Sequence, residues 1–136
     1  MIARQRHWRD DSGLTGIAAT VMMLIVLAGA GLIYDGGRAL AARRETINTA
    51  EAAARAGAAT VTADGLSRDP ARAAALAFLD AAGVSRTDVV EITITPNTVT
   101  VTLRASRDAV FGQLLGNDTI VVRGTGKATA TFGRPP

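Results

Sequence analysis

Side chains capable of catalysis or metal binding are scarce in this chain of 136 residues. The absence of cysteine excludes disulfides and thiolate metal sites, and the single histidine, His7, excludes histidine-dependent triads and multi-histidine metal sites within one chain. The carboxylates of the second half stand mostly where helix caps and turns are expected, at Asp64, Asp69, Asp80, Asp88, Glu91, Asp108 and Asp118. We therefore predict no catalytic residue, no cofactor and no metal.

The segment Gly124-Thr125-Gly126-Lys127 superficially suggests a phosphate-binding loop. It lacks the full spacing of such loops, and it lies within a strand pattern instead of before a helix. On the inner side of that strand, Gly124 and Gly126 suggest a bulge or a close backbone approach. Fifteen basic residues against twelve acidic ones form no basic patch, and no segment carries the clustered aromatic residues of a base-stacking surface. We predict neither a nucleic-acid partner nor a small-molecule substrate.

Asp35 is the unusual charge, because it directly follows an uncharged run and precedes Gly36, Gly37 and Arg38. A carboxylate at this position pairs either with Arg38 or with an arginine of another subunit. The alternative is an unpaired Asp in water or lipid headgroups, which costs little. Both interpretations remain open at this stage.

The element that positions Asp35 is the run from Leu14 to Tyr34, which contains no charge and no proline. As a helix it would be roughly 31 Å long, the thickness of the hydrocarbon core of a bilayer. We predict a transmembrane helix at 14–34. The alternatives are a cleaved secretory signal, for which the run is long, and a buried core helix.

Residues 1–13 form a predicted cytoplasmic tail, because Arg4, Arg6 and Arg9 precede the span. The protein is then a single-pass protein of the cell membrane with an extracytoplasmic C-terminal domain.

A helical extension is predicted at 35–63, because the sequence stays rich in alanine and free of proline. One predicted stripe contains Leu40, Ile47, Ala50, Ala54, Ala58 and Val61. This stripe needs a partner, either the C-terminal domain of the same chain or a neighbouring copy. The small residues that we predict to pack against other helices or segments are Gly29, Gly36, Gly37, Ala50, Ala54 and Gly57.

A small α+β domain is predicted at 64–132, followed by a disordered tail at 133–136. Its first helix is expected to be capped by Asp69, with Pro70 at the first position, and to stop at Gly83. Alternating apolar and polar residues predict three antiparallel strands, and Pro96-Asn97 is a hairpin turn. The strands are expected at 89–95, 98–105 and 119–132, and a second short helix at 106–115, capped by Ser106.

Two segments together resemble a known family. Asp35-Gly36-Gly37-Arg38 directly after an apolar run, followed by the alanine-rich segment 50–58, is similar to the N-terminal region of TadE/TadG-like proteins. These proteins belong to tight-adherence (Flp-type IVb) pilus assembly systems, and the composition resembles actinobacterial members. The resemblance covers about residues 9–59. It implies a type IV pilin-like fold and a role as minor pilin, pseudopilin or assembly factor.

The resemblance also implies other pilus or secretion-system subunits as partners, among them a membrane platform and a secretion ATPase, with possible self-association. The sequence departs from processed pilins at one position. The resemblance makes Gly13 and Leu14 a candidate prepilin-peptidase site, with cleavage after Gly13. If Leu14 were the first mature residue, the fifth would be Ala18 instead of the glutamate of processed pilins. TadG-like members, which are less clearly processed, fit better. The alternative function is a membrane-anchored extracytoplasmic binding or sensing module unrelated to pili.

Overall fold

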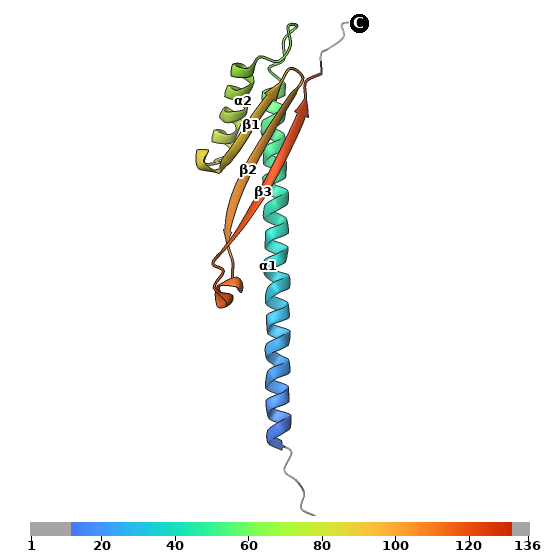
Figure 1. The fold of residues 1–136 in the computed structure, drawn as a ribbon, viewed down its shortest axis with the longest axis vertical. Coiled ribbons are helices and arrows are strands. Elements are labelled where there is room, and N and C mark those ends of the chain that lie inside the picture. The colour runs from blue at the N-terminus through green and yellow to red at the C-terminus, as the bar shows by residue number, and fades with distance from the viewer. Residues whose placement is uncertain (1–11, 132–136) are drawn as a thin grey trace, which may run out of the picture.

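The computed structural model describes residues 12–131, in which one long helix carries a small domain along its C-terminal half (Figure 1). This helix, α1, runs unbroken over Ser12–Ala58 and includes the glycine pair at 36–37. It ends five residues before the end of the predicted extension at 35–63, and residues 59–60 form a turn. The predicted tails at 1–13 and 133–136 lie outside the described residues, except that Ser12 and Gly13 belong to α1.

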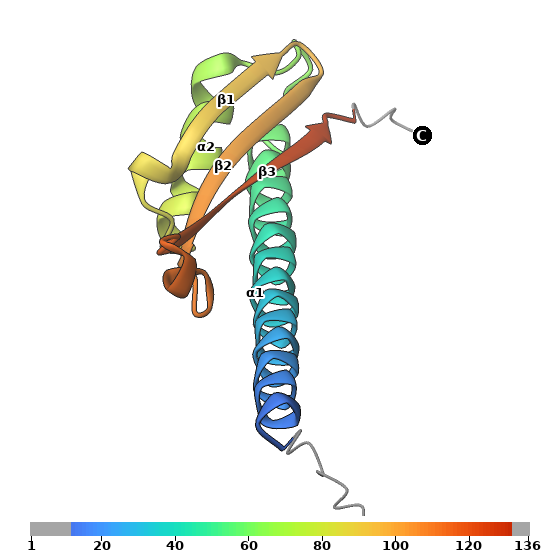
Figure 2. The same cartoon turned by 60° about the horizontal axis from the view of Figure 1, so that its bottom comes forward.

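The N-terminal part of α1 is long and apolar enough to cross a membrane. An 18-residue window has a mean hydropathy of 2.4, and only 6% of this window is buried inside the molecule. Figure 2 shows this part of the helix standing clear of the sheet. The low burial contradicts the alternative of a buried core helix. The cleaved-signal alternative stays open, because a signal sequence passes the same test of length and composition.

Three strands form an antiparallel sheet in the order β1-β2-β3, with β1 at Val89–Thr95, β2 at Thr98–Asp108 and β3 at Thr119–Thr129. Thr95 pairs with Thr98, so the expected two-residue turn at Pro96-Asn97 closes the β1–β2 hairpin. The predicted α+β fold, with a long N-terminal helix and a three-stranded antiparallel sheet, is confirmed.

The second helix, α2 at Arg68–Ala81, lies beside α1 on the same face of the sheet (Figures 1 and 2). Alanines of both helices meet the branched side chains of the strands in one core, which contains Ala50, Ala53, Ala54, Ala58, Ala71, Ala75, Leu79, Ile92, Val99, Val101, Leu103, Ala128 and Ala130. The opposite face of the sheet carries threonine and charged side chains. The sheet is therefore covered on one face and exposed to water on the other, as its alternation predicts.

The predicted second short helix at 106–115 is wrong. Ser106 and Asp108 belong to β2, where they pair with Val121 and Thr119 of β3. The ladder continues to the end of both strands, and the backbone groups that a helix would need are already bonded across the sheet. Only a short 3₁₀ turn, η2 at Gly112–Leu115, forms in this connection, and a second one, η1 at Arg86–Asp88, precedes β1.

The expected cap of α2 is also misplaced. The helix begins at Arg68, Ser67 occupies the cap position without a side-chain hydrogen bond, and Asp69 lies in the first turn. There its negative charge still faces the positive end of the helix. At the other end, Gly83 follows the helix with a φ of 73°, which confirms it as the stop.

Two apolar residues face the opposite way from their predicted side. Val90 is 48% exposed, because an irregularity between Val89 and Glu91 shifts the β1–β2 register and reverses the alternation there. Leu40 is 59% exposed, because the sheet covers the face of α1 that carries Ala42 and Thr46.

Candidate functional site at the helix–domain junction

Two glycines of β3 lie directly against the backbone of α1. A Cβ atom added to Gly124 would stand 2.6 Å from the backbone nitrogen of Ile47, and one added to Gly126 would overlap the backbone of Ala50 and Glu51. Strand and helix therefore touch backbone to backbone. Lys127 is exposed on the outer face of the strand. The Gly-Thr-Gly-Lys segment thus forms a packing surface within a strand, which is the close approach that its position suggested.

The predicted packing residues in the C-terminal half of α1 contact the chain's own domain. Ala50 and Ala54 are fully buried. A Cβ on Gly57 would lie 2.9 Å from the carbonyl oxygen of Ala71 in α2 and 3.2 Å from a methyl group of Val99. Of the two partners that the alanine stripe required, the C-terminal domain of the same chain is the one seated on it.

The predicted packing residues near the end of the apolar segment have no such partner in the described chain. A Cβ on Gly29, Gly36 or Gly37 would meet nothing within 4 Å. Steps of seven and four residues return to the same face of a helix, so Gly29, Gly36 and Leu40 share one face. Ile33, 79% exposed, lies on that side too. This face of α1 points away from the domain and is open to another molecule.

Asp35 binds the loop between β2 and β3. Its carboxylate accepts hydrogen bonds from the backbone N–H groups of Val110 at 3.1 Å, Phe111 at 2.8 Å and Gly112 at 2.8 Å. These N–H groups stand at the start of η2, where a helix has no internal acceptor for them. A side chain of α1 thus caps a 3₁₀ turn more than seventy residues later in the chain.

The same loop contacts α1 through an aromatic ring. The ring of Phe111 lies so close to Gly31 that a Cβ there would stand 2.6 Å from it. The rings of Phe111 and Tyr34 meet edge to face, with centroids 6.1 Å apart. The loop is therefore held at two levels of α1, by packing at Gly31 and by hydrogen bonds at Asp35.

The charge on Asp35 is stabilised by its surroundings. Burial works against the charged form, but the three backbone N–H donors and the positive charge of Arg38 outweigh it, so the pKa of Asp35 lies below its ordinary value of 3.8. The guanidinium of Arg38 lies 6.0 Å from the centroid of the Tyr34 ring. Arg38 acts on Asp35 through its charge, and pairing of either residue with another subunit stays a prediction.

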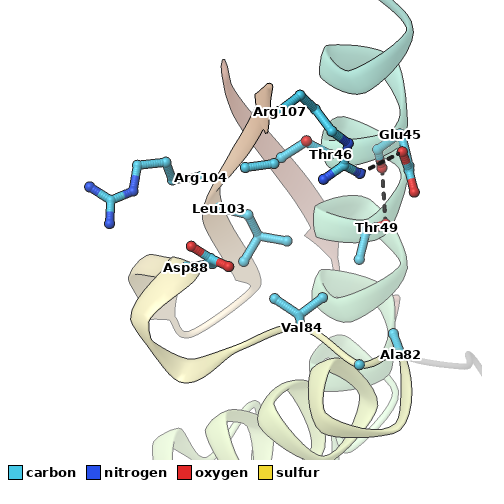
Figure 3. A pocket seen from close by; sticks show the side chains of 11 residues that line it. Glu45, Thr46, Thr49, Ala82, Val84, Asp88, Leu103, Arg104 and Arg107 are labelled. Atoms are coloured by element: carbon cyan, nitrogen blue, oxygen red, sulfur yellow. Dashed lines mark hydrogen bonds and ion pairs between the residues drawn. The ribbon is translucent and has the colours of Figure 1, made fainter. Parts of the chain in front are cut away.

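A shallow cleft of about 200 Å³ separates α1 from the segment after α2 and from β2 (Figure 3). Arg107 of β2 reaches Glu45 of α1 at 3.2 Å, whereas Arg104 points away from the cleft. Leu103 and Val84 supply its apolar wall. Within residues 12–131, no group of three or more His, Asp or Glu side chains is placed to hold a metal ion. The Glu45–Arg107 pair serves as a second tie between sheet and helix.

Gly13 and Leu14, the candidate peptidase site, lie in the first turn of α1. A Cβ on Gly13 would meet nothing within 4 Å, and Leu14 is largely exposed. Both residues are part of the helix, so cleavage between them would need that first turn to open. Whether such cleavage occurs stays a prediction.

Sequence reasoning found Asp35 but missed its partners. Local spacing pointed to Arg38, whereas the carboxylate binds N–H groups that belong to a loop remote in sequence. One signal was present in that loop. Gly112 is required there, because a Cβ would stand 2.8 Å from the carbonyl oxygen of Asn117.

The comparisons with known proteins bear on the helix that carries this site. No curated protein and no solved structure matches the chain. A family model does match about a third of it, and the matched residues contain the apolar segment, Asp35 and the alanine-rich extension. Over residues 13–60, and thus over nearly the whole of α1, the chain is similar to the pilus-assembly family described as "Putative Flp pilus-assembly TadE/G-like".

Proposed function

We propose that this protein is a single-pass, pilin-like structural component of a tight-adherence pilus or a related secretion apparatus. It works through protein–protein contacts made by α1, with the N-terminus in the cytoplasm and the domain outside. The observation that carries the proposal is the unbroken helix Ser12–Ala58, whose exposed apolar part continues into a part clamped by the domain. The family match over residues 13–60 coincides with this helix and supports the same role.

The two halves of α1 have different surroundings, and this difference supports the proposed function. The C-terminal half is occupied by the chain's own sheet and α2, so it is a rigid mount for the domain. The face with Gly29 and Gly36 remains open, as does Gly37 beside it, and it lies where the helix leaves the apolar segment. Small residues let two helix backbones approach closely in lipid. This face is the surface we assign to other pilus subunits or to a second copy of the chain.

The contact surface is tested by replacing Gly29, Gly36 and Gly37 together with leucine. The new side chains have open space around them in the described chain, so the domain should keep its fold. We expect co-purification of the protein with other pilus subunits to fall strongly. The matched control is Gly16→Leu, the same change at another open glycine of α1. Unchanged co-purification of the triple variant would exclude this surface.

Orientation and processing are tested separately. The chain has no cysteine, so Asn97→Cys in the β1–β2 turn gives a unique label site. A membrane-impermeant maleimide should label this cysteine in cells whose outer layers are permeabilised but whose cell membrane is intact. Labelling only after lysis would contradict the proposed orientation and place the domain in the cytoplasm. Mass spectrometry of the mature N-terminus then separates a permanent anchor, which starts at Met1, from peptidase cleavage, which leaves Leu14 first.

A further inference from the structure

The loop that Asp35 holds, residues 109–118, reaches down beside the apolar part of α1. Figures 1 and 2 show it at the end of the sheet that points toward the N-terminus of α1. Its ring at Phe111 packs on Gly31, which precedes the end of the 14–34 segment by three residues, or roughly 4–5 Å of helix. If residues 14–34 occupy the hydrocarbon, this loop is therefore level with its outer edge.

Between the loop and α1 lies an apolar groove of about 310 Å³. Its walls come from α1 at Ala28 and Leu32 and from the loop and the start of β3, at Ala109, Phe111 and Ile120. Leu32 is exposed, so the groove is continuous with the lipid-facing surface of the helix. Val110, in the same loop, is another apolar side chain that is 47% exposed.

Six backbone N–H groups of the loop have partners within the chain, which suits a segment near hydrocarbon. Non-helical backbone is tolerated at membrane depth only where its polar groups find partners. Asp35 accepts from the N–H groups of residues 110–112, and the N–H groups of residues 109, 116 and 117 bond to carbonyls within the loop. Each of these six N–H groups is thus bonded within the chain, without help from water.

The residues above the loop suit the headgroup region. Tyr34 ends the apolar segment, and Arg38, one turn further on, lies over its ring. Aromatic rings and arginines are typical of the level at which a helix leaves the bilayer. The charged and aromatic side chains therefore place the membrane boundary just above the loop, in agreement with the packing of Phe111 on Gly31.

From these observations we propose that residues 109–118 are a membrane-interface foot of the domain, and that the groove beside Phe111 holds an acyl chain of the outer leaflet. The foot fixes the height and tilt of the domain above the membrane. This inference rests on the proposed membrane anchoring of α1. A second copy of the chain is the competing occupant of the groove.

The test measures quenching of tryptophan by brominated phospholipids in reconstituted vesicles. All variants carry Trp8→Phe, because Trp8 is the single tryptophan of the chain. Val110→Trp reports on the exposed side of the loop, and Ile25→Trp reports on the centre of the span. Asn117→Trp reports on the groove, which Asn117 lines. Val121→Trp is the matched control, because Val121 is exposed on the sheet face turned away from α1.

We expect bromines near the carbonyl end of the acyl chains to quench Val110→Trp and Asn117→Trp strongly and Val121→Trp little. Ile25→Trp should be quenched most by bromines near the chain ends. Loss of quenching at Ile25→Trp would overturn the anchoring itself. Quenching there without quenching at Val110 and Asn117 would overturn the foot alone. If Val110→Trp and Asn117→Trp were shielded from both bromolipid and aqueous acrylamide, another protein surface would occupy the groove instead of lipid.

Discussion

Gly126 lies against the backbone of Glu51 with no room for a side chain between them. Gly124 repeats this contact one helical turn earlier, at Ile47. A strand and a helix usually pack through their side chains, so this pair of contacts brings β3 unusually close to α1. The domain is fixed to α1 along this line, and these contacts determine which face of α1 remains open.

Gly126→Ala should destabilise the domain, because the added Cβ overlaps the backbone of α1, which cannot move aside as a flexible side chain would. Overpacking of this kind costs about 1–3 kcal/mol or more in free energy of unfolding. Pulse proteolysis in urea measures this loss for the domain in detergent. The control Lys127→Ala changes an exposed neighbour and should be close to neutral. Equal stability of the two variants would contradict the backbone contact.

Asp35→Asn should loosen the loop without unfolding the sheet. An amide oxygen is a weaker acceptor than a carboxylate, and its NH₂ group faces N–H donors that it cannot bond. We expect the amides of residues 110–112 to exchange with solvent about tenfold faster or more. A hydrogen bond to a charged group contributes about 1.5–3 kcal/mol, and a tenfold change in exchange corresponds to about 1.4 kcal/mol. Hydrogen–deuterium exchange of the loop checks this. Asp80→Asn, which breaks the exposed pair with Arg86, should leave the loop unchanged.

The contact of Asp35 with the loop should survive mild acidification. Its pKa is lowered in the folded protein, so the stabilisation is present above the ordinary value of 3.8 and is lost as the pH falls through the lower folded value. NMR titration of the amide shifts of residues 110–112 should give a midpoint below 3.8. A midpoint above 3.8 would mean that burial dominates over the N–H donors.

The pair Glu45–Arg107 should contribute little to stability, although it joins α1 to β2. Both side chains are about half exposed or more, so water and salt screen their attraction. A double-mutant cycle with Glu45→Gln and Arg107→Gln should give a coupling of about 0.2–1 kcal/mol. A much larger coupling energy would mean that this ion pair, and not the glycine contacts, holds the sheet on α1.

The fold was largely predictable from local patterns. The uncharged run and the alanine-rich extension gave one helix, and strict alternation gave the three strands. The predictions fail where a tertiary contact determines the local structure. Nothing in the sequence of residues 106–115 shows that β3 extends the ladder to Asp108, so a helix seemed plausible. Val90 turned outward because of a register shift that the alternation of β1 hides.

The site was predictable only in part. Asp35 stood out as a charge at the end of an apolar run, and Gly124 and Gly126 indicated a close backbone approach. The loop that binds Asp35 offers it no basic side chain, only backbone N–H groups. The residue types of Val110 and Phe111 give no sign that their N–H groups bind a carboxylate. Contacts made by backbone groups across a long stretch of chain are therefore missed by motif reasoning.

Leu79→Ala should test whether α2 holds the domain together as the core suggests. Leu79 is fully buried among alanines of α1 and branched side chains of the sheet, and small neighbours cannot swell to fill the space that it leaves. A buried Leu→Ala change costs about 2–5 kcal/mol in free energy of unfolding, toward the upper end where the site cannot collapse. Pulse proteolysis of the variant in urea measures the loss. The control is Phe78→Ala, whose larger ring is more than a third exposed and should cost less despite its size. If Phe78→Ala proved the more damaging change, the face of α2 that we assign to the core would be the wrong one.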